Sequence, residues 1–246
     1  MNYIKSEFYR TIRCRGFVIA SGVIFALCAA VIILCAVMNQ NYTVKVTGSA
    51  ILGLVIMISG SFLYFAAMIG YLIDNGEKKE HTVKHTVAYG IAREKLYLLR
   101  FANQAVWGTA VYFLTAGLLW LLSALLLPGT DAESVNLFWK TIVTLYPLCI
   151  GTLALLHAIS MNMENTNLSI VPLALILSVL PWALQIIGMR FEIMTEVARW
   201  LPSSLANYSR ILEEAGMVEK CWGVGIFWIA ASSAVGILLY KKQEIR

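Results

Sequence analysis

The sequence contains six runs of predominantly apolar residues, each long enough to cross a lipid bilayer as a helix. These runs cover residues 17–38, 46–73, 101–127, 135–160, 168–189 and 221–240. The hydrocarbon core of a bilayer is about 30 Å thick, which corresponds to about 20 residues of α-helix. The runs are continuously apolar, whereas the strands of membrane β-barrels alternate apolar and polar residues. The sequence therefore predicts an all-α polytopic membrane protein with six transmembrane helices in a single domain.

The composition supports the membrane assignment. Of the 246 residues, 59% are hydrophobic and 13% are charged, whereas about a quarter of the residues in soluble domains are charged. The mean hydropathy is +0.74. The formal net charge is +5, but the basic residues lie between the apolar runs and do not form one patch, so nucleic acid is not an expected partner.

Lysine and arginine are concentrated on one side of the predicted topology. Cytoplasmic loops of membrane proteins carry an excess of these residues, so we expect both termini and the loop 74–100 to be cytoplasmic. The predicted inner side carries Lys5, Arg10, Arg13, Arg15, Lys78, Lys79, Lys84, Arg93, Lys95, Arg100, Lys241, Lys242 and Arg246. The predicted outer side carries Lys45, Lys140, Arg190, Arg199, Arg210 and Lys220.

The N-terminal residues 1–16 have the pattern of an interfacial helix. Ile4, Phe8 and Ile12 recur every four residues beside Lys5 and Arg13, which is typical of an amphipathic helix on an anionic membrane surface. The run that follows is about twice as long as the apolar part of a signal peptide, ~10 residues, and lacks an A-x-A-like cleavage site. We therefore expect it to be a retained span.

The outer segment 190–220 is too polar to span a membrane. Met194, Val197 and Leu201 are at helical spacing, Pro202 interrupts the pattern, and Gly216 is a plausible end of a second helix. The second helical set is Leu205, Tyr208, Ile211 and Leu212. The pattern predicts two short amphipathic helices that lie along the outer surface or re-enter the membrane in part.

Small residues and prolines mark two of the spans. Small residues in the second span favour close helix packing, although a dimer seam or a conduit wall would have the same pattern. These residues are Gly48, Ser49, Gly53, Ser59, Gly60, Ser61 and Gly70. Pro172 and Pro181 predict a kink in the fifth span, either structural or part of a moving gate.

The predicted spans carry few ionisable residues. No carboxylate lies near the centre of a span, which argues against a carrier driven by an ion gradient. His157 lies within one turn of the inner end of its span, where we expect it to be half-solvated, and Lys140 is close enough to the outer interface to extend into water.

Motifs of enzymes and metal sites are missing from the sequence. It contains no H-E-x-x-H, no G-x-S-x-G, and no G-x-x-x-x-G-K-[ST] phosphate-binding loop. We interpret the five cysteines as small buried apolar residues, because no two are closely spaced. They are Cys14, Cys28, Cys35, Cys149 and Cys221. We therefore expect no catalysis and no cofactor in this chain, so any ATP must be bound by another chain.

The segment 82–100 carries a resemblance to a known family. Lys84, Gly90 and Arg93 fit a K-x-x-x-x-x-G-x-x-R pattern directly before the third span. This pattern resembles the cytoplasmic segment between the second and third spans of ABC type-2 transporter permeases, in particular those of small bacterial exporters for bacitracin or lantibiotic resistance. The layout of the whole chain is similar to that of this family. Two departures are His81, where a small residue is expected, and Arg100, where a lysine is usual.

The resemblance implies a function and partners. Two permease chains, identical or related, would pair in the bacterial cytoplasmic membrane and bind a cytoplasmic ABC ATPase dimer that holds ATP and Mg²⁺. The chain would form the path for a lipophilic or peptide substrate, such as an antimicrobial peptide. The contact with the ATPase would be made by Glu77, Lys78, Lys79, Glu80, Lys84, Tyr89, Gly90, Arg93, Glu94 and Lys95.

Two other functions are compatible with the same spans. One is a membrane scaffold or sensor that transports nothing and recruits a cytoplasmic partner through the loop 74–100. The other is a gradient-driven carrier. The scaffold would co-purify without an ATPase, and the carrier would be inactivated by a protonophore.

Overall fold

The computed structural model describes residues 2–41, 43, 45–78, 92–163 and 166–242. Within these ranges every regular element is a helix. Five of the described helices are long and apolar enough to cross a membrane, and a bent pair makes a sixth candidate. The prediction of an all-α protein with several helices long and apolar enough to cross a membrane is therefore confirmed.

The helices follow the predicted runs in order. The described helices up to residue 162 are α1 (Asn2–Arg13), α2 (Arg15–Asn41), α3 (Gly48–Met57), α4 (Ser61–Lys78), α6 (Arg93–Leu126) and α7 (Ala132–Asn162). The C-terminal half contains η1 (Thr166–Ser169), α8 (Ile170–Ala174), η2 (Leu175–Val179), α9 (Leu180–Gly188), α10 (Glu192–Arg199), α11 (Pro202–Leu205), α12 (Tyr208–Glu213) and α13 (Met217–Lys242). The helices α4 and α6 extend into the two ends of the predicted segment 74–100.

The second span is not the continuous helix that the apolar run predicted. It is divided into α3 and α4, which meet at an angle of 74°. The Ser59 N–H bonds to the Ile56 carbonyl, and the Ser59 hydroxyl donates to the Ala206 carbonyl at 3.2 Å. A Cβ on Gly60 would lie 3.6 Å from the same carbonyl. A contact with the turn after α11 therefore accompanies the bend.

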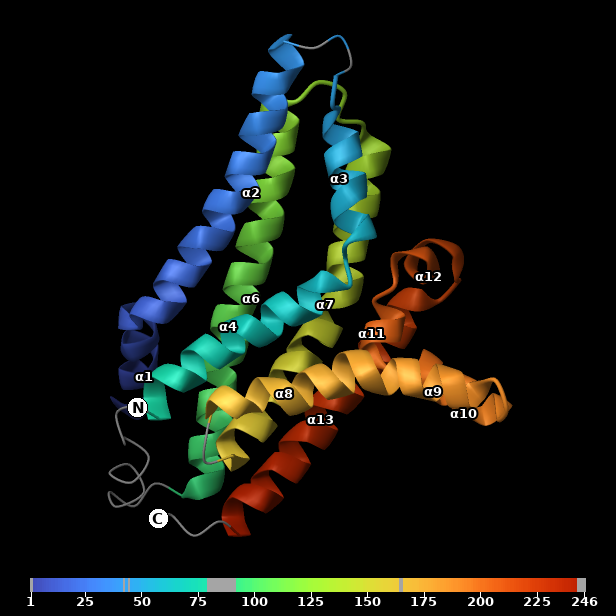
Figure 1. Ribbon diagram of the computed structural model, residues 1–246. Coiled ribbons are helices and arrows are strands. Elements are labelled where there is room, and N and C mark those ends of the chain that lie inside the picture. The colour runs from blue at the N-terminus through green and yellow to red at the C-terminus, as the bar shows by residue number, and fades with distance from the viewer. Residues whose placement is uncertain (1, 42, 44, 79–91, 164–165, 243–246) are drawn as a thin grey trace.

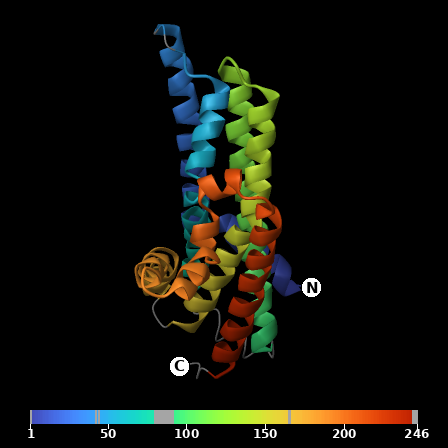
Figure 2. The same ribbon diagram turned by 90° about the vertical axis from the view of Figure 1, so that its right-hand side faces the viewer.

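The fifth span contains a local irregularity between its two prolines. A π-helical turn, η2, lies between Pro172 and Pro181. Proline lacks an N–H and its ring crowds the carbonyl four residues earlier, so the widened turn relieves this crowding. The segment from α8 to α9 runs across the long axis of α6 and α7, since it is seen from the side in Figure 1 and end-on in Figure 2.

The segment 190–220 forms three short helices where two were predicted. The break at Pro202 is confirmed, because α10 ends at Arg199 and α11 begins with this proline. Asn207 divides the second predicted helix, since its side chain accepts a hydrogen bond from the Ser209 N–H and caps α12. Gly216 has a φ of +72° and follows α12, in agreement with the predicted helix end.

The central helix of the bundle is α7. Of its most apolar stretch 72% is buried, against 11% to 22% in the other four long apolar helices. It packs against α13, α4, α6 and α3. The contact with α13 is especially close, because Gly151 and Gly225 bring the two backbones together.

Two loops meet at the end of the molecule opposite to α1, which we call the loop end (Figure 1). The Gly48 N–H donates to the Pro128 carbonyl at 2.9 Å, and the Ser49 hydroxyl donates to the Gly129 carbonyl at 2.9 Å. The Asp131 side chain accepts from the Ser134 N–H and so caps α7, and it also accepts from the Ser49 hydroxyl. The N-termini of α3 and α7 are thereby joined.

The cap residue Asp131 predicts a pH dependence of stability. Hydrogen bonds from the Ser49 hydroxyl and from Ser134 lower its pKa to about 2, from about 3.9 in an unfolded chain. Its contribution is therefore present above about pH 4 and is lost as the pH falls towards about 2. We expect Asp131→Asn, which keeps a capping side chain, to have a lower unfolding temperature at neutral pH and the wild-type value near pH 2. Glu133→Gln, at an exposed neighbouring position, is the control, and a difference independent of pH would contradict the prediction.

Candidate functional site

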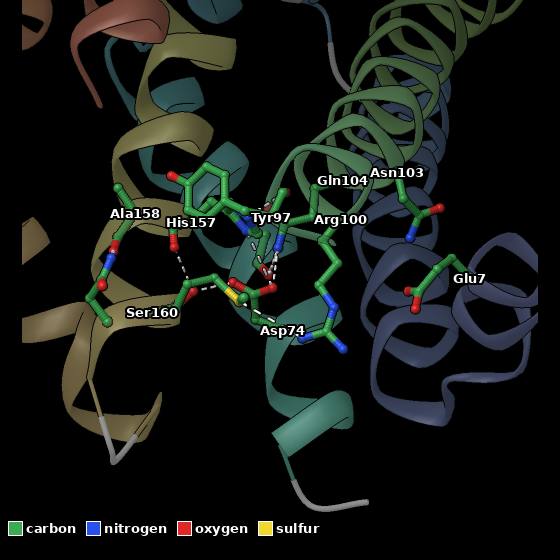
Figure 3. A network of polar contacts seen from close by, with 12 residues as sticks. Glu7, Asp74, Tyr97, Arg100, Asn103, Gln104, His157, Ala158 and Ser160 are labelled. Atoms are coloured by element: carbon green, nitrogen blue, oxygen red, sulfur yellow. Dashed lines mark hydrogen bonds and ion pairs between the residues drawn. The ribbon is translucent and has the colours of Figure 1, made fainter. Parts of the chain in front are cut away.

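Polar side chains from three helices form a buried cluster at the end of the molecule where α1 lies and α13 ends, which we call the terminal end (Figure 3). The cluster consists of Asp74 on α4, Gln104 on α6, and His157 and Ser160 on α7. These four residues are at most 3% exposed. Ionisable groups at such depth are costly unless they are paired or hydrogen-bonded, so the cluster is a candidate functional site.

The carboxylate of Asp74 is the centre of this cluster. Its Oδ1 atom accepts a hydrogen bond from the Gln104 amide, and its Oδ2 atom accepts one from the Ser160 hydroxyl. The Nδ1 atom of His157 lies 3.6 Å from Oδ1. The Gln104 amide also reaches the Gly70 carbonyl at 3.5 Å. These contacts join α4 to both α6 and α7.

The imidazole of His157 is fixed by α6. Its Nε2 atom lies 3.2 Å from the backbone carbonyl of Tyr97. The rings of Tyr97 and Phe101 lie beside it, with centroids 4.6 Å and 5.9 Å away. The first turns of α6 are thus held to α7 by backbone and aromatic contacts.

A second ring of residues surrounds the cluster. Arg100 is only 2% exposed, its Nη1 atom lies 3.9 Å from the Met161 sulfur, and its side chain points between Asp74 and Glu7 in Figure 3. The ring of Tyr240 on α13 lies 6.2 Å from that of Tyr97. A basic side chain, Arg100, is therefore buried at the same end of the molecule as the cluster.

The structure describes five of the ten residues of the predicted ATPase contact. Lys79, Glu80, Lys84, Tyr89 and Gly90 lie outside the described residues. Glu77 and Lys78 belong to the last turn of α4, and Arg93, Glu94 and Lys95 form the first turn of α6.

The three residues at the start of α6 differ in their surroundings. Glu94 forms an ion pair with Lys241, and Arg93 donates to the Lys241 carbonyl at 3.3 Å. Lys95 is exposed. The end of α13, which the sequence did not connect with this segment, is therefore part of its support.

Sequence reasoning missed the buried cluster. His157 was predicted to be half-solvated, which is wrong, because its side chain is fully buried. Asp74 was placed in the cytoplasmic loop but lies inside the bundle, because α4 continues to Lys78. The spacing carried a usable signal: residues 97, 100 and 104 share one face of α6, and residues 157 and 160 share one face of α7.

An apolar cavity of about 300 Å³ lies nearer the middle of the bundle, between α2, α3, α4, α6 and α7. Exposed side chains on α2 and α3, among them Leu27 and Leu54, line its rim, and the half-buried Tyr146 and the buried Cys149 lie among its walls. The Tyr146 hydroxyl is bonded to that of Thr109 at 3.0 Å. None of the described residues that line this cavity is charged, so its surface suits a hydrocarbon group.

The described residues contain no group of three or more His, Cys, Asp or Glu side chains placed to hold a metal ion. No protein-family model matches the chain, and no curated protein matches it significantly. The resemblance to ABC type-2 permeases therefore depends on the residues of the sequence alone.

Proposed function

We propose that this chain is the membrane permease subunit of an ATP-driven exporter of the ABC type-2 class. In this proposal it resides in a bacterial cytoplasmic membrane with both termini in the cytoplasm. It pairs with a second permease chain and binds a separate ATPase dimer, which holds ATP and Mg²⁺. The residues from Glu77 to Lys95, from the end of α4 to the start of α6, are the contact with the ATPase.

One observation carries the proposal. Both helices that flank residues 79–91 are anchored through the Asp74 cluster to α7, the most buried helix of the bundle. A displacement of this segment by a soluble partner would therefore act on α7 directly, since packed elements move as units. A loop that only connected two spans would not require such an anchor.

The apolar cavity supports a lipophilic or amphiphilic substrate. Ligand sites are typically cavities of about 300 to 1,000 Å³ with mainly apolar walls, and this cavity lies at the lower end of that range. Substrates with a hydrocarbon part, including antimicrobial peptides, fit this chemistry.

Lys95 provides the test of the proposed contact. It is exposed in the first turn of α6, so Lys95→Glu should not affect folding. We expect this substitution to reduce recovery of the ATPase with the tagged permease by about 2-fold to 5-fold, as for a charge at the rim of an interface. The double variant Arg93→Glu/Lys95→Glu should reduce it further and lower the ATPase activity of the complex.

The matched control is Lys45→Glu, which makes the same charge change at an exposed position of the loop end. It should leave recovery unchanged. Equal recovery with all variants, or a co-purifying partner without a phosphate-binding loop, would contradict the proposal and favour a scaffold. Transport that survives ATP depletion and stops with a protonophore would instead indicate a gradient-driven carrier.

A further inference from the structure

The hydrogen bonding of His157 determines where its protons must be. The Nε2 atom faces the Tyr97 carbonyl at 3.2 Å. A carbonyl oxygen only accepts hydrogen bonds, so this contact requires a proton on Nε2. The other ring nitrogen, Nδ1, then carries a lone pair in the neutral imidazole and a proton in the imidazolium ion.

The position of Asp74 requires one more proton. Its Oδ1 atom lies 3.6 Å from the His157 Nδ1 atom, with both side chains buried. A carboxylate facing the Nδ1 lone pair would be repelled. The contact is attractive only if one proton is shared by the two groups, either on Nδ1 as an ion pair or on Asp74 as a neutral acid.

The neighbours of Asp74 can accommodate a change of its charge. The Oε1 atom of Gln104 is buried and has no hydrogen-bond partner among the described residues. Rotation of this amide would let Oε1 accept a hydrogen bond from a neutral Asp74, and the Ser160 hydroxyl can either donate or accept one. Both forms that hold one proton, the ion pair and the neutral acid, can therefore make their hydrogen bonds without movement of the helices.

We propose that Asp74 and His157 form a proton-binding site, and that the bound proton holds α4 against α7. When the proton is released, the carboxylate and the Nδ1 lone pair face each other, and the contact between the two helices weakens. The local pH would thus determine how firmly α4, which leads into the segment 79–91, is held to the bundle. This inference does not require the ATPase proposed above.

Other titratable or charged side chains surround the proposed site. Tyr97 and Arg100 face it from α6, Tyr240 from α13, and Glu7 with its ion-pair partner Arg10 from α1. Because these neighbours are themselves titratable or charged, the experiment must isolate His157 from them.

The chain allows a direct observation of His157 without altering the site. It contains three histidines, His81, His85 and His157. In the full-length variant His81→Gln/His85→Gln, every ¹⁵N-imidazole signal comes from His157. We expect these signals, recorded from about pH 5 to pH 8, to show a proton on Nε2 throughout and loss of the second proton as the pH rises. Adding Asp74→Asn should move this transition by about one pH unit or more.

Stability gives a second readout. A stabilising proton contributes fully at low pH, and its contribution is lost as the pH rises through the release of the proton. The unfolding temperature of the detergent-solubilised wild type should therefore fall as the pH rises from about 5 to about 8. His157→Gln should make the unfolding temperature less dependent on pH, whereas His81→Gln/His85→Gln should not. A His157 signal that does not change over this range, or that changes identically with Asp74→Asn, would overturn the proposal. If His157→Gln does not fold, the imidazole signals decide alone.

Discussion

Replacing Gly225 by alanine should destabilise the protein by about 1 to 3 kcal/mol, the usual cost of forcing extra volume into a packed contact. A Cβ at this position would lie 2.5 Å from the carbonyl carbon of Pro147 and 2.6 Å from its oxygen. These are backbone atoms of α7, so no side-chain rotation removes the overlap. The two helices must move apart along the most extensive helix contact of the bundle.

The neighbouring Gly223 supplies the matched control. It lies on the same helix, and a Cβ there would meet no atom within 4 Å. Alanine forms helices better than glycine by about 1 kcal/mol, so Gly223→Ala should be neutral or stabilising. Both variants gain the same helix propensity. The difference between their unfolding temperatures in detergent therefore measures the cost of the overlap between α13 and α7 alone. Equal temperatures would show that α13 does not approach α7 as closely as described.

Hydropathy predicted the spans well but not the course of the second span. A long apolar run reports that a segment avoids water, and this property is local to the sequence. The bend between α3 and α4 involves the contact of Ser59 with Ala206, which is 147 positions away. Serine and glycine are also common within straight membrane helices, so no local pattern distinguishes this bend from a straight helix.

The buried cluster shows a similar limit for the candidate site. Asp74 and His157 lie near the ends of apolar runs, where polar residues usually reach water, so the sequence favoured exposure. The structure buries them because α4 and α6 continue as helices beyond the apolar runs and pack on α7. The polar spacing on α6 and α7 indicated two faces, but it could not show that the faces meet around one carboxylate.

Replacing Asp74 by alanine should be the most damaging change within the cluster, with an expected loss of about 3 to 5 kcal/mol, as for removal of one partner from a buried pair. The Gln104 amide would lose its closest acceptor, and any positive charge on His157 would lose its counterion. Ser160 would be affected less, because its hydroxyl also reaches the His157 carbonyl at 3.2 Å. Asp131→Ala is the control, since that carboxylate is exposed at the loop end, and its effect should be much smaller.

The double variant Asp74→Ala/His157→Leu separates two explanations for this loss. If the damage comes from an uncompensated group left in the interior, removal of both partners should be less harmful than Asp74→Ala alone, because apolar replacement of a whole buried pair is often nearly neutral. If the double variant is less stable than either single variant, the pair contributes favourable energy of its own. Unfolding temperatures of the three variants in the same detergent distinguish these cases. An Asp74→Ala protein as stable as the wild type would show that the carboxylate does not anchor α4 to α7.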